Sequence, residues 1–359
     1  MTIERLHNIS IEKIRYNDLN DLEKIFTSAF GEEFDAEQIR RRIRRIRQFY
    51  YVLLPLSSLS LWLKNLFNIY ICRVDDKVAG FMQVSYFNSK QLHLDYIAIS
   101  KKYRGQGLGT LVLQKLLDKA ARKDYDLILE VRKDNPAYSL YERMGFVEQA
   151  QILHYSKLIE STHQKKREHL HRTIQGVRKR QDADWQQIYS LYLKTLPTNL
   201  RKVVRREVRE FNPSLFTKTM EWVKNYLMGN TKQQYVVERH GTIVGTVEMQ
   251  SYLKAGSHIV NVMIDKEHEL LREPLLRKAL NCLRHHKGES VGTTIYADGF
   301  HKEAVLEKLG FVQTEAYYLM FRPPNPVYKS AARCVAKFHQ RLGKVEGFKP
   351  KRTSYAAIE

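Results

Sequence analysis

The sequence predicts an α/β protein built from two consecutive copies of one unit, and three observations predict it. The chain has 359 residues, which is long enough to bury at least two hydrophobic cores. Separated segments of the first half recur in the second half at a nearly constant distance. Within each half, strand-like apolar runs alternate with helix-like ones, which indicates a sheet with helices on its faces.

The repeat is clearest around two glycines of the first half. Gly80 and Gly145 recur as Gly245 and Gly310, both after a shift of 165 residues. Their surroundings repeat as well, since ICRVDDKVAGF resembles VVERHGTIVGT and YERMGFVEQ resembles LEKLGFVQT. A constant shift in separated segments is hard to obtain by chance. We therefore expect a first domain at residues 1–160, a basic linker at 161–175, a second domain at 176–323 and a basic tail at 324–359.

The first copy is expected to alternate strands and helices in a fixed order. Its strands are predicted at residues 11–16, 69–74, 78–87, 91–100, 126–132 and 146–156. Asp75 and Asp76 form a tight turn between the second and third strands. The helix after the fourth strand has one apolar face, made of Leu108, Leu111, Val112, Leu116 and Ala120.

Composition and charge restrict the function classes. The net charge of +21 should attract anionic ligands, and it makes nucleic acid or an acidic surface a candidate partner. Much of the basic excess lies in Arg40–Arg47, Lys165–Arg180 and Lys329–Arg352, and each of these stretches could equally be a solvated face or linker. The N-terminus lacks the pattern of a signal peptide, and the longest apolar stretch, Val52–Phe67, is interrupted by polar residues. No transmembrane segment is expected.

The cysteines and histidines do not suggest a disulfide framework or a metal site. The three cysteines, Cys72, Cys282 and Cys334, are far apart and show no C-x-x-C spacing, which favours a reducing cytoplasm. The pairs His268–Glu269 and His285–His286 lack a second ligand cluster. We therefore expect no bound metal.

The most informative segment is LDYIAISKKYRGQGLGTLVLQKLL, in which an apolar strand leads through a glycine-rich loop into an amphipathic helix. Glycines allow close approach of a ligand to the backbone, and the first N–H groups of a helix have no intrahelical partner. This arrangement is typical of a phosphate-binding site. It is not a triphosphate-binding P-loop, and the dinucleotide pattern fails because Thr110 stands three residues after Gly107.

The loop residues Arg104, Gly107 and Gly109 resemble the R/Q-x-x-G-x-G/A signature of the GNAT acetyltransferase superfamily. The downstream segment DLILEVRKDNPAYSLYERMGF resembles the family's second conserved block. The resemblance covers most of residues 10–160. It implies two tandem GNAT-like domains, each with a mixed, mostly antiparallel twisted sheet flanked by helices. It also implies an N-acetyltransferase that uses acetyl-CoA as co-substrate, with the primary amine of a small molecule, protein N-terminus or lysine as acceptor.

The resemblance also implies which residues hold the co-substrate. The pyrophosphate of coenzyme A is expected on the backbone of Arg104, Gly105, Gln106, Gly107, Leu108 and Gly109. The pantetheine arm is expected along the strand edge at Ile97, Ala98 and Ile99, where a bulge separates this strand from its neighbour. Asn135 matches the family's conserved asparagine, although it lies one residue closer to Tyr141 than in the commonest form of the motif.

Acetyl transfer requires a base for the acceptor amine, whose pKa is about 10, and an acid for the departing thiolate. Glu130 is expected to be the base, directly or through water; the alternative is a strand-edge carboxylate that faces solvent or pairs with Arg132. Tyr141 matches the family's acid; the alternative is a core aromatic beneath the turn at Gly145–Phe146. The stretch Val52–Phe67 is where the family carries helices that bound the acceptor, and it could form a buried helix pair, an apolar acceptor pocket or a membrane-surface contact.

The second copy has lost this chemistry. At the shift of 165, Arg104, Gly107 and Gly109 become Glu269, Arg272 and Pro274, and Glu130, Asn135 and Tyr141 become Ile295, Phe300 and Leu306. We expect a degenerate domain that packs, shapes the acceptor site or recruits a partner. Two alternatives to the acetyltransferase stay open: an aminoacyl or long-chain acyl transferase, and a nucleic-acid-binding or scaffold protein with a vestigial GNAT fold.

Overall fold

The computed structural model describes residues 8–30, 40, 43–44, 46–57, 61–159, 174–204, 206–253, 256–284, 289–297 and 300–324. Nearly all of the expected linker and tail therefore lies outside the described residues. The same holds for Lys329–Arg352, for most of Lys165–Arg180 and for the pair His285–His286.

The first half follows the predicted order of elements. Its strands are β1 (Ile9–Lys13), β2 (Ile69–Val74), β3 (Lys77–Asn88), β4 (Gln91–Ile99), β5 (Asp126–Val131) and β6 (Val147–Leu158). Its described α-helices are α1 (Leu19–Phe30), α3 (Tyr50–Leu56), α4 (Leu61–Leu66), α5 (Leu108–Lys123) and α6 (Tyr138–Arg143). The first strand ends earlier than predicted because the Asp18 carboxylate accepts a hydrogen bond from the Arg15 amide at 2.8 Å and starts a 3₁₀ turn there.

The second half repeats this order. Its strands are β7 (Val177–Lys179), β8 (Asn230–Arg239), β9 (Thr242–Tyr252), β10 (Ser257–Ile264), β11 (Ser290–Tyr296) and β12 (Val312–Arg322). Its described α-helices are α7 (Trp185–Thr195), α8 (Val208–Phe211), α9 (Leu215–Met228), α10 (Arg272–Leu283) and α11 (Phe300–Lys308). The β2–β3 turn at Asp75–Asp76 and the β8–β9 turn at His240–Gly241 both use positive φ values, as a tight hairpin requires.

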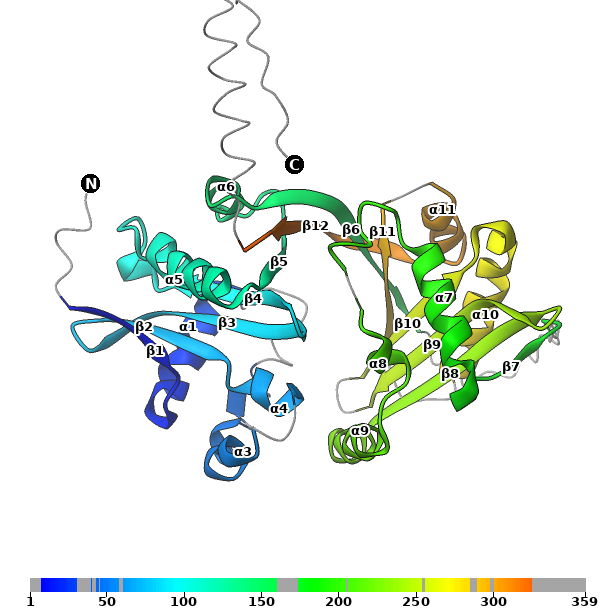
Figure 1. The fold of residues 1–359 in the computed structure, drawn as a ribbon, viewed down its shortest axis with the longest axis horizontal. Coiled ribbons are helices and arrows are strands. Elements are labelled where there is room, and N and C mark those ends of the chain that lie inside the picture. Colours follow the sequence, from blue (N-terminus) through cyan, green and yellow to red (C-terminus); the bar gives the residue numbers. More distant parts are fainter. Residues whose placement is uncertain are drawn as a thin grey trace, which may run out of the picture.

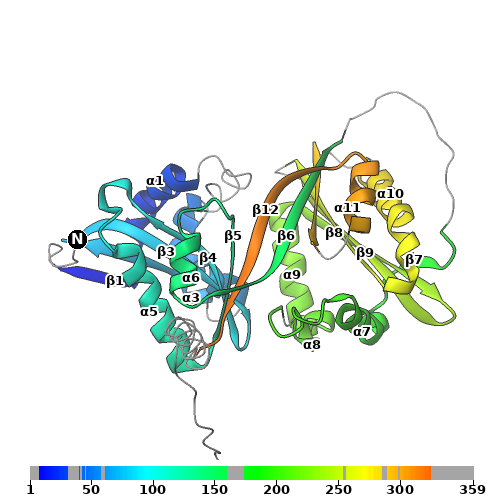
Figure 2. The ribbon, with the colours of Figure 1, turned by 90° about the horizontal axis from the view of Figure 1, so that it is seen from above.

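The two halves share one continuous sheet. The strand order is β1-β2-β3-β4-β5-β12-β6-β11-β10-β9-β8-β7. Each half therefore gives its last strand to the other: β12 lies between β5 and β6, and β6 lies between β12 and β11. Figures 1 and 2 show these two strands side by side, bridging the halves. The sequence predicted each half's sheet but not this exchange.

Helices cover both faces of the sheet. In the first half, α5 packs on one face through Val112, Leu113 and Leu116, and α1 packs on the opposite face through Leu22 and Phe26. In the second half, α10 packs on one face and α7 on the other. The α7 core also contains side chains from β5, β6 and β12, so it joins the two halves.

Hydrogen bonds strengthen this junction. The Gln91 side-chain amide donates to the Val203 carbonyl at 2.6 Å, and both residues' polar groups are buried. The Ser89 amide donates to the Glu207 carboxylate at 2.7 Å. The segment between α7 and α8 therefore holds the β3–β4 hairpin of the first half.

The stretch Val52–Phe67 includes most of α3 and all of α4, but this helix pair is not fully buried. Tyr51, Val52 and Leu54 are exposed on α3, whereas Leu66 at the end of α4 is buried. No helix among the described residues is long and apolar enough to cross a membrane.

Candidate functional site

The candidate site lies where β4 and β5 separate. These strands pair in parallel over four residues, and the last pair is Leu94–Leu129. The next residue of β4, Asp95, is an extra residue relative to β3 and forms the expected bulge. Beyond the bulge, Ile97–Ile99 pair with β3, and no described strand pairs with their other edge. This part of β4 therefore offers backbone groups to a ligand.

The glycine loop follows directly after β4. Gly105 and Gly107 have φ values of 74° and 81°, which L-residues rarely adopt, and Gly107 caps the start of α5. The Arg104 side chain folds back and donates from Nε to the Ile99 carbonyl at 2.9 Å. The loop geometry thus depends on both the glycines and this arginine.

The backbone amides of the loop lack partners. No described residue accepts a hydrogen bond from the amides of residues 105–110, and the first helical hydrogen bond of α5 is donated by Leu111 to the Gly107 carbonyl. Lys101, Lys102 and Arg104 are exposed beside these amides. A row of free N–H groups at a helix N-terminus, flanked by cations, is suited to a phosphate or pyrophosphate group. The Gln106 side-chain amide donates to the Lys102 carbonyl at 3.2 Å and leaves the backbone amides of the loop free.

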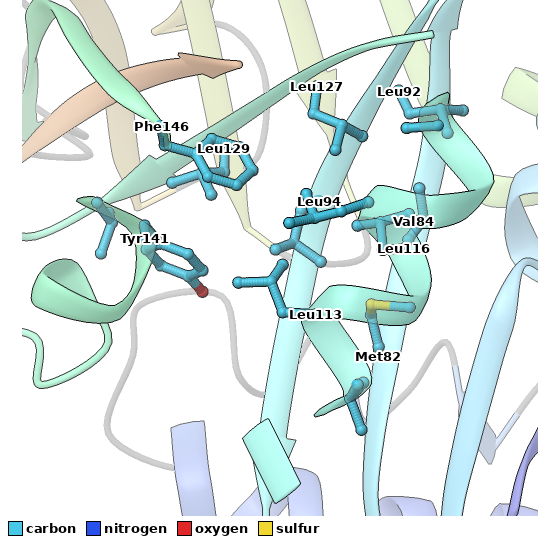
Figure 3. Close-up of a cluster of buried hydrophobic side chains, with 14 of the residues drawn as sticks. Met82, Val84, Leu92, Leu94, Leu113, Leu116, Leu127, Leu129, Tyr141 and Phe146 are labelled. Carbon is cyan, nitrogen blue, oxygen red and sulfur yellow. The ribbon is translucent and has the colours of Figure 1, made fainter. Parts of the chain in front are cut away.

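Tyr141 lies on α6 within the core between α5 and the sheet. Its side chain is only 6% exposed, and its ring contacts Phe146 in an edge-on arrangement with centroids 5.8 Å apart. Figure 3 shows its hydroxyl pointing toward Leu113 of α5. No described residue hydrogen-bonds this hydroxyl, and burial raises the pKa of Tyr141 well above its usual range. The residue is therefore both a packing aromatic and a protonated phenol.

Glu130 projects from the opposite face of β5. Its neighbours Leu129 and Val131 belong to the core beneath α5, so the alternation of the strand turns Glu130 away from that core. Glu130 is exposed, and none of the described residues forms an ion pair with it. Arg132, which the sequence offered as a partner, pairs instead with Asp134 at 2.6 Å.

Asn135 lies in the turn before α6. Its side-chain oxygen accepts a hydrogen bond from the Ala137 amide at 2.9 Å, and its carbonyl accepts one from the Tyr138 amide. Asn135 is exposed, so its side-chain NH₂ group is available to a ligand as a donor.

A polar network near Glu130 was missed by the sequence reasoning. His93 Nδ1 lies 2.7 Å from the Asp95 carboxylate, which also accepts a hydrogen bond from Ser85 at 2.8 Å. Burial lowers the pKa of His93, but the hydrogen bond with Asp95 and the charges of Asp95 and Glu130 outweigh it and raise that pKa. The short spacing of His93 and Asp95 was visible in the sequence, but only the bulge brings the two side chains together.

The second half has a different arrangement at the corresponding helix. Arg272, at the start of α10, is buried and forms an ion pair with Glu269. A carboxylate therefore lies where the first half presents free amides. Among the described residues, no three His, Cys, Asp or Glu side chains are grouped as metal ligands would be.

Comparison with known proteins agrees with this geometry. Residues 19–146 match the model of the acetyltransferase (GNAT) family. An N-alpha-acetyltransferase from Sulfurisphaera tokodaii is 35% identical over 101 residues, which is 24% of this chain and 60% of the relative. The chain thus matches less than two thirds of that relative's length.

Solved structures match nearly the whole chain. A GCN5-related N-acetyltransferase from Sphaerobacter thermophilus has a TM-score of 0.56 at 16% identity, covering 89% of this chain and 96% of the other. A tandem GNAT protein from the clavulanic acid biosynthesis pathway has a TM-score of 0.52 at 13% identity, covering 89% and 99%. At these identities the likeness shows the fold.

Proposed function

We propose that the first half of the chain moves an acetyl group from acetyl-CoA to a primary amine, because residues 19–146 match the model of the acetyltransferase (GNAT) family. The row of free amides at residues 105–110, beside the opening between β4 and β5, is the observation that carries the proposal. These amides bind the pyrophosphate, and the unpaired edge of β4 at Ile97–Ile99 hydrogen-bonds the pantetheine arm. Asn135 contributes a side-chain donor.

Acetyl-CoA, when bound, supplies a thioester carbonyl that an amine can attack. Glu130 accepts the proton that the ammonium form of the acceptor must lose, and Tyr141 donates a proton to the departing sulfur. The two residues lie on opposite faces of the sheet. This supports a direct transfer in which the amine arrives from the Glu130 face and the thiol leaves on the Tyr141 face.

The resemblance of the first half to an N-alpha-acetyltransferase suggests which class of amine is the acceptor. The activity that this relative is named for favours the amino group at a peptide N-terminus as the acceptor, although small amines use the same chemistry. We propose residues 1–160 as the catalytic domain and 176–323 as the degenerate domain, with each half's last strand placed in the other half's part of the sheet.

The test is calorimetric titration of acetyl-CoA into the intact protein and two glycine variants. Gly105 and Gly241 have φ values of 74° and 75°, and a Cβ at either position meets no atom within 4 Å. Gly105→Glu and Gly241→Glu therefore impose the same backbone strain, but only Gly105→Glu places a carboxylate in the loop. We expect one equivalent of acetyl-CoA to bind the intact protein and Gly241→Glu, and at least a tenfold weaker affinity for Gly105→Glu. Equal binding by all three proteins would contradict the assigned loop.

A further inference from the structure

A large cavity passes through the second half of the sheet. Its volume is about 1550 Å³, and it occupies the opening beyond the last β10–β11 pair, Ile259–Gly292. Its lining comes from both faces of the sheet, because Ile264 and Ile295 belong to the core beneath α10 and Tyr192 belongs to α7. Sites for single small ligands usually have volumes of about 300–1000 Å³. The cavity can therefore hold an extended ligand.

This cavity is not suited to a second molecule of coenzyme A. The ion pair of Glu269 with Arg272 lies at the start of α10, where a pyrophosphate would need free amides. Glu273 and Pro274 follow in the first turn, which adds a negative charge and removes one N–H donor. The second half thus keeps the opening of the fold without its phosphate loop.

The charge of the lining favours an anionic ligand. Seven Lys or Arg side chains and four Glu side chains contribute to the cavity wall. Each of the four glutamates already forms an ion pair with a cation of the same wall. Lys266 has no carboxylate partner among the described residues, and Arg180 donates to an amide oxygen and a carbonyl instead of a carboxylate. The wall therefore carries surplus positive charge.

The end of the cavity at Tyr296 lies toward the candidate site, although no described residue of the first half lines the cavity. Tyr296 lines the cavity and pairs with Ile152 of β6, while Glu130 pairs with Leu319 of the adjacent strand β12. Burial, with the charge of Glu130, raises the pKa of Tyr296 to about 12. Arg206 also lines the cavity and acts on Tyr296 electrostatically. Glu130 and Tyr296 lie on strands three positions apart, about 14 Å in the sheet, which is a distance that an extended acceptor can span.

We propose that this cavity binds the acceptor, and that the acceptor is an extended amine that carries carboxylate groups. The proposal rests on the proposed function of the first half. The body of the acceptor occupies the cavity, its carboxylates contact cations of the wall such as Arg206, and its amine passes Tyr296 to reach Glu130. The second half is then the acceptor-binding part of one composite active site.

The test compares acceptors that carry carboxylate groups with related acceptors that lack them. One pair consists of the C-terminally amidated peptides Ser-Glu-Phe-Glu-Leu-Glu and Ser-Gln-Phe-Gln-Leu-Gln, and the other pair is phenylalanine and phenethylamine. We expect the acidic member of the peptide pair to have roughly a tenfold lower KM, the effect of one charge-assisted contact. A preference in the peptide pair supports the extended acceptor, whereas a preference in the second pair alone would contradict its extended form and indicate a small acidic amine. Equal KM values within both pairs would overturn the proposal.

Variants of the intact chain locate the effect. Arg206→Gln should raise the KM for the preferred acidic acceptor about tenfold and leave the KM for acetyl-CoA unchanged. Arg277→Gln is the matched control. The Arg206 side chain is 52% exposed and forms an ion pair with Glu210. The Arg277 side chain on α10 is similarly exposed, at 56%, and forms an ion pair with Glu273. Thr294→Trp, which fills the cavity from β11, should lower the rate at least tenfold while one equivalent of acetyl-CoA still binds.

The outcomes separate this proposal from the proposed function. Equal effects of Arg206→Gln and Arg277→Gln, or full activity of Thr294→Trp, would overturn the cavity assignment. Acetylation of none of the four probes, with acetyl-CoA bound at one equivalent, would also overturn it. Failure of the intact protein to bind acetyl-CoA would instead contradict the proposed function itself.

Discussion

At the scale of single residues, the environment of Glu130 is set by its neighbours on one face of the sheet. His93 lies on this face, and its pKa is raised by Asp95 and Glu130 against the effect of burial. His93 therefore keeps its positive charge to a higher pH than an ordinary histidine does. On the other face, Tyr141 stays protonated because burial raises its pKa. The proposed acid Tyr141 thus keeps its proton over the pH range where proteins are stable.

Replacement of Glu130 by Gln tests the base. We expect Glu130→Gln to lower kcat by about 10²–10⁴-fold, which is the usual contribution of a general base, with unchanged affinity for acetyl-CoA. The loss should diminish as the pH rises toward the pKa of the amine, because more of the acceptor is then already deprotonated. Asp126→Asn, at the far end of the same strand, is the control and should keep its activity. A kcat deficit of Glu130→Gln that does not change with pH would assign Glu130 a structural role.

At the scale of secondary-structure elements, local patterns predicted most of the fold and the backbone form of the candidate site's loop. Strand β2 begins and ends where its alternation predicted, and the glycine loop adopts positive φ at two of its glycines. The strand exchange could not be predicted, because β6 and β12 follow the same Gly–Phe turn and have similar alternation. Either strand could pair with β5, and only contacts distant in the sequence decide between them. The network of His93 and Asp95 was missed for a similar reason, since it depends on a bulge.

The exchange assigns Met320 to the core of the first half, although it lies on the last strand of the second. Met320 is fully buried with α5, whereas Met249 is buried in the core beneath α10. Each substitution to Ala should lower the free energy of unfolding by about 2–5 kcal/mol. Hydrogen exchange should then show faster amide exchange in α5 for Met320→Ala but not for Met249→Ala. The reverse result would mean that β12 does not pack with the first half.

At the scale of the whole molecule, the sheet has an approximate two-fold relation between the halves. When each strand is replaced by its counterpart in the other half, the strand order reads the same from the opposite end. Such an arrangement buries β5, β6, β11 and β12 in the centre of the sheet, where none of them is an edge. The composite site proposed above needs this continuity, because it places Glu130 and Tyr296 on strands that are separated by only β12 and β6.

This continuity predicts that the first half does not fold alone as a monomer. In a fragment of residues 1–159, β5 would lose its neighbour β12, and Leu129 and Val131 would lose their partners Met320 and Tyr318. An exposed apolar strand edge pairs with other chains, so we expect dimers or aggregates in light scattering. Co-expression with residues 160–359 should restore a one-to-one complex that binds acetyl-CoA. A monomeric fragment with the thermal stability of the intact protein would contradict this prediction, because it would mean that β6 can pair with β5 in place of β12 and that the first half is an independent domain.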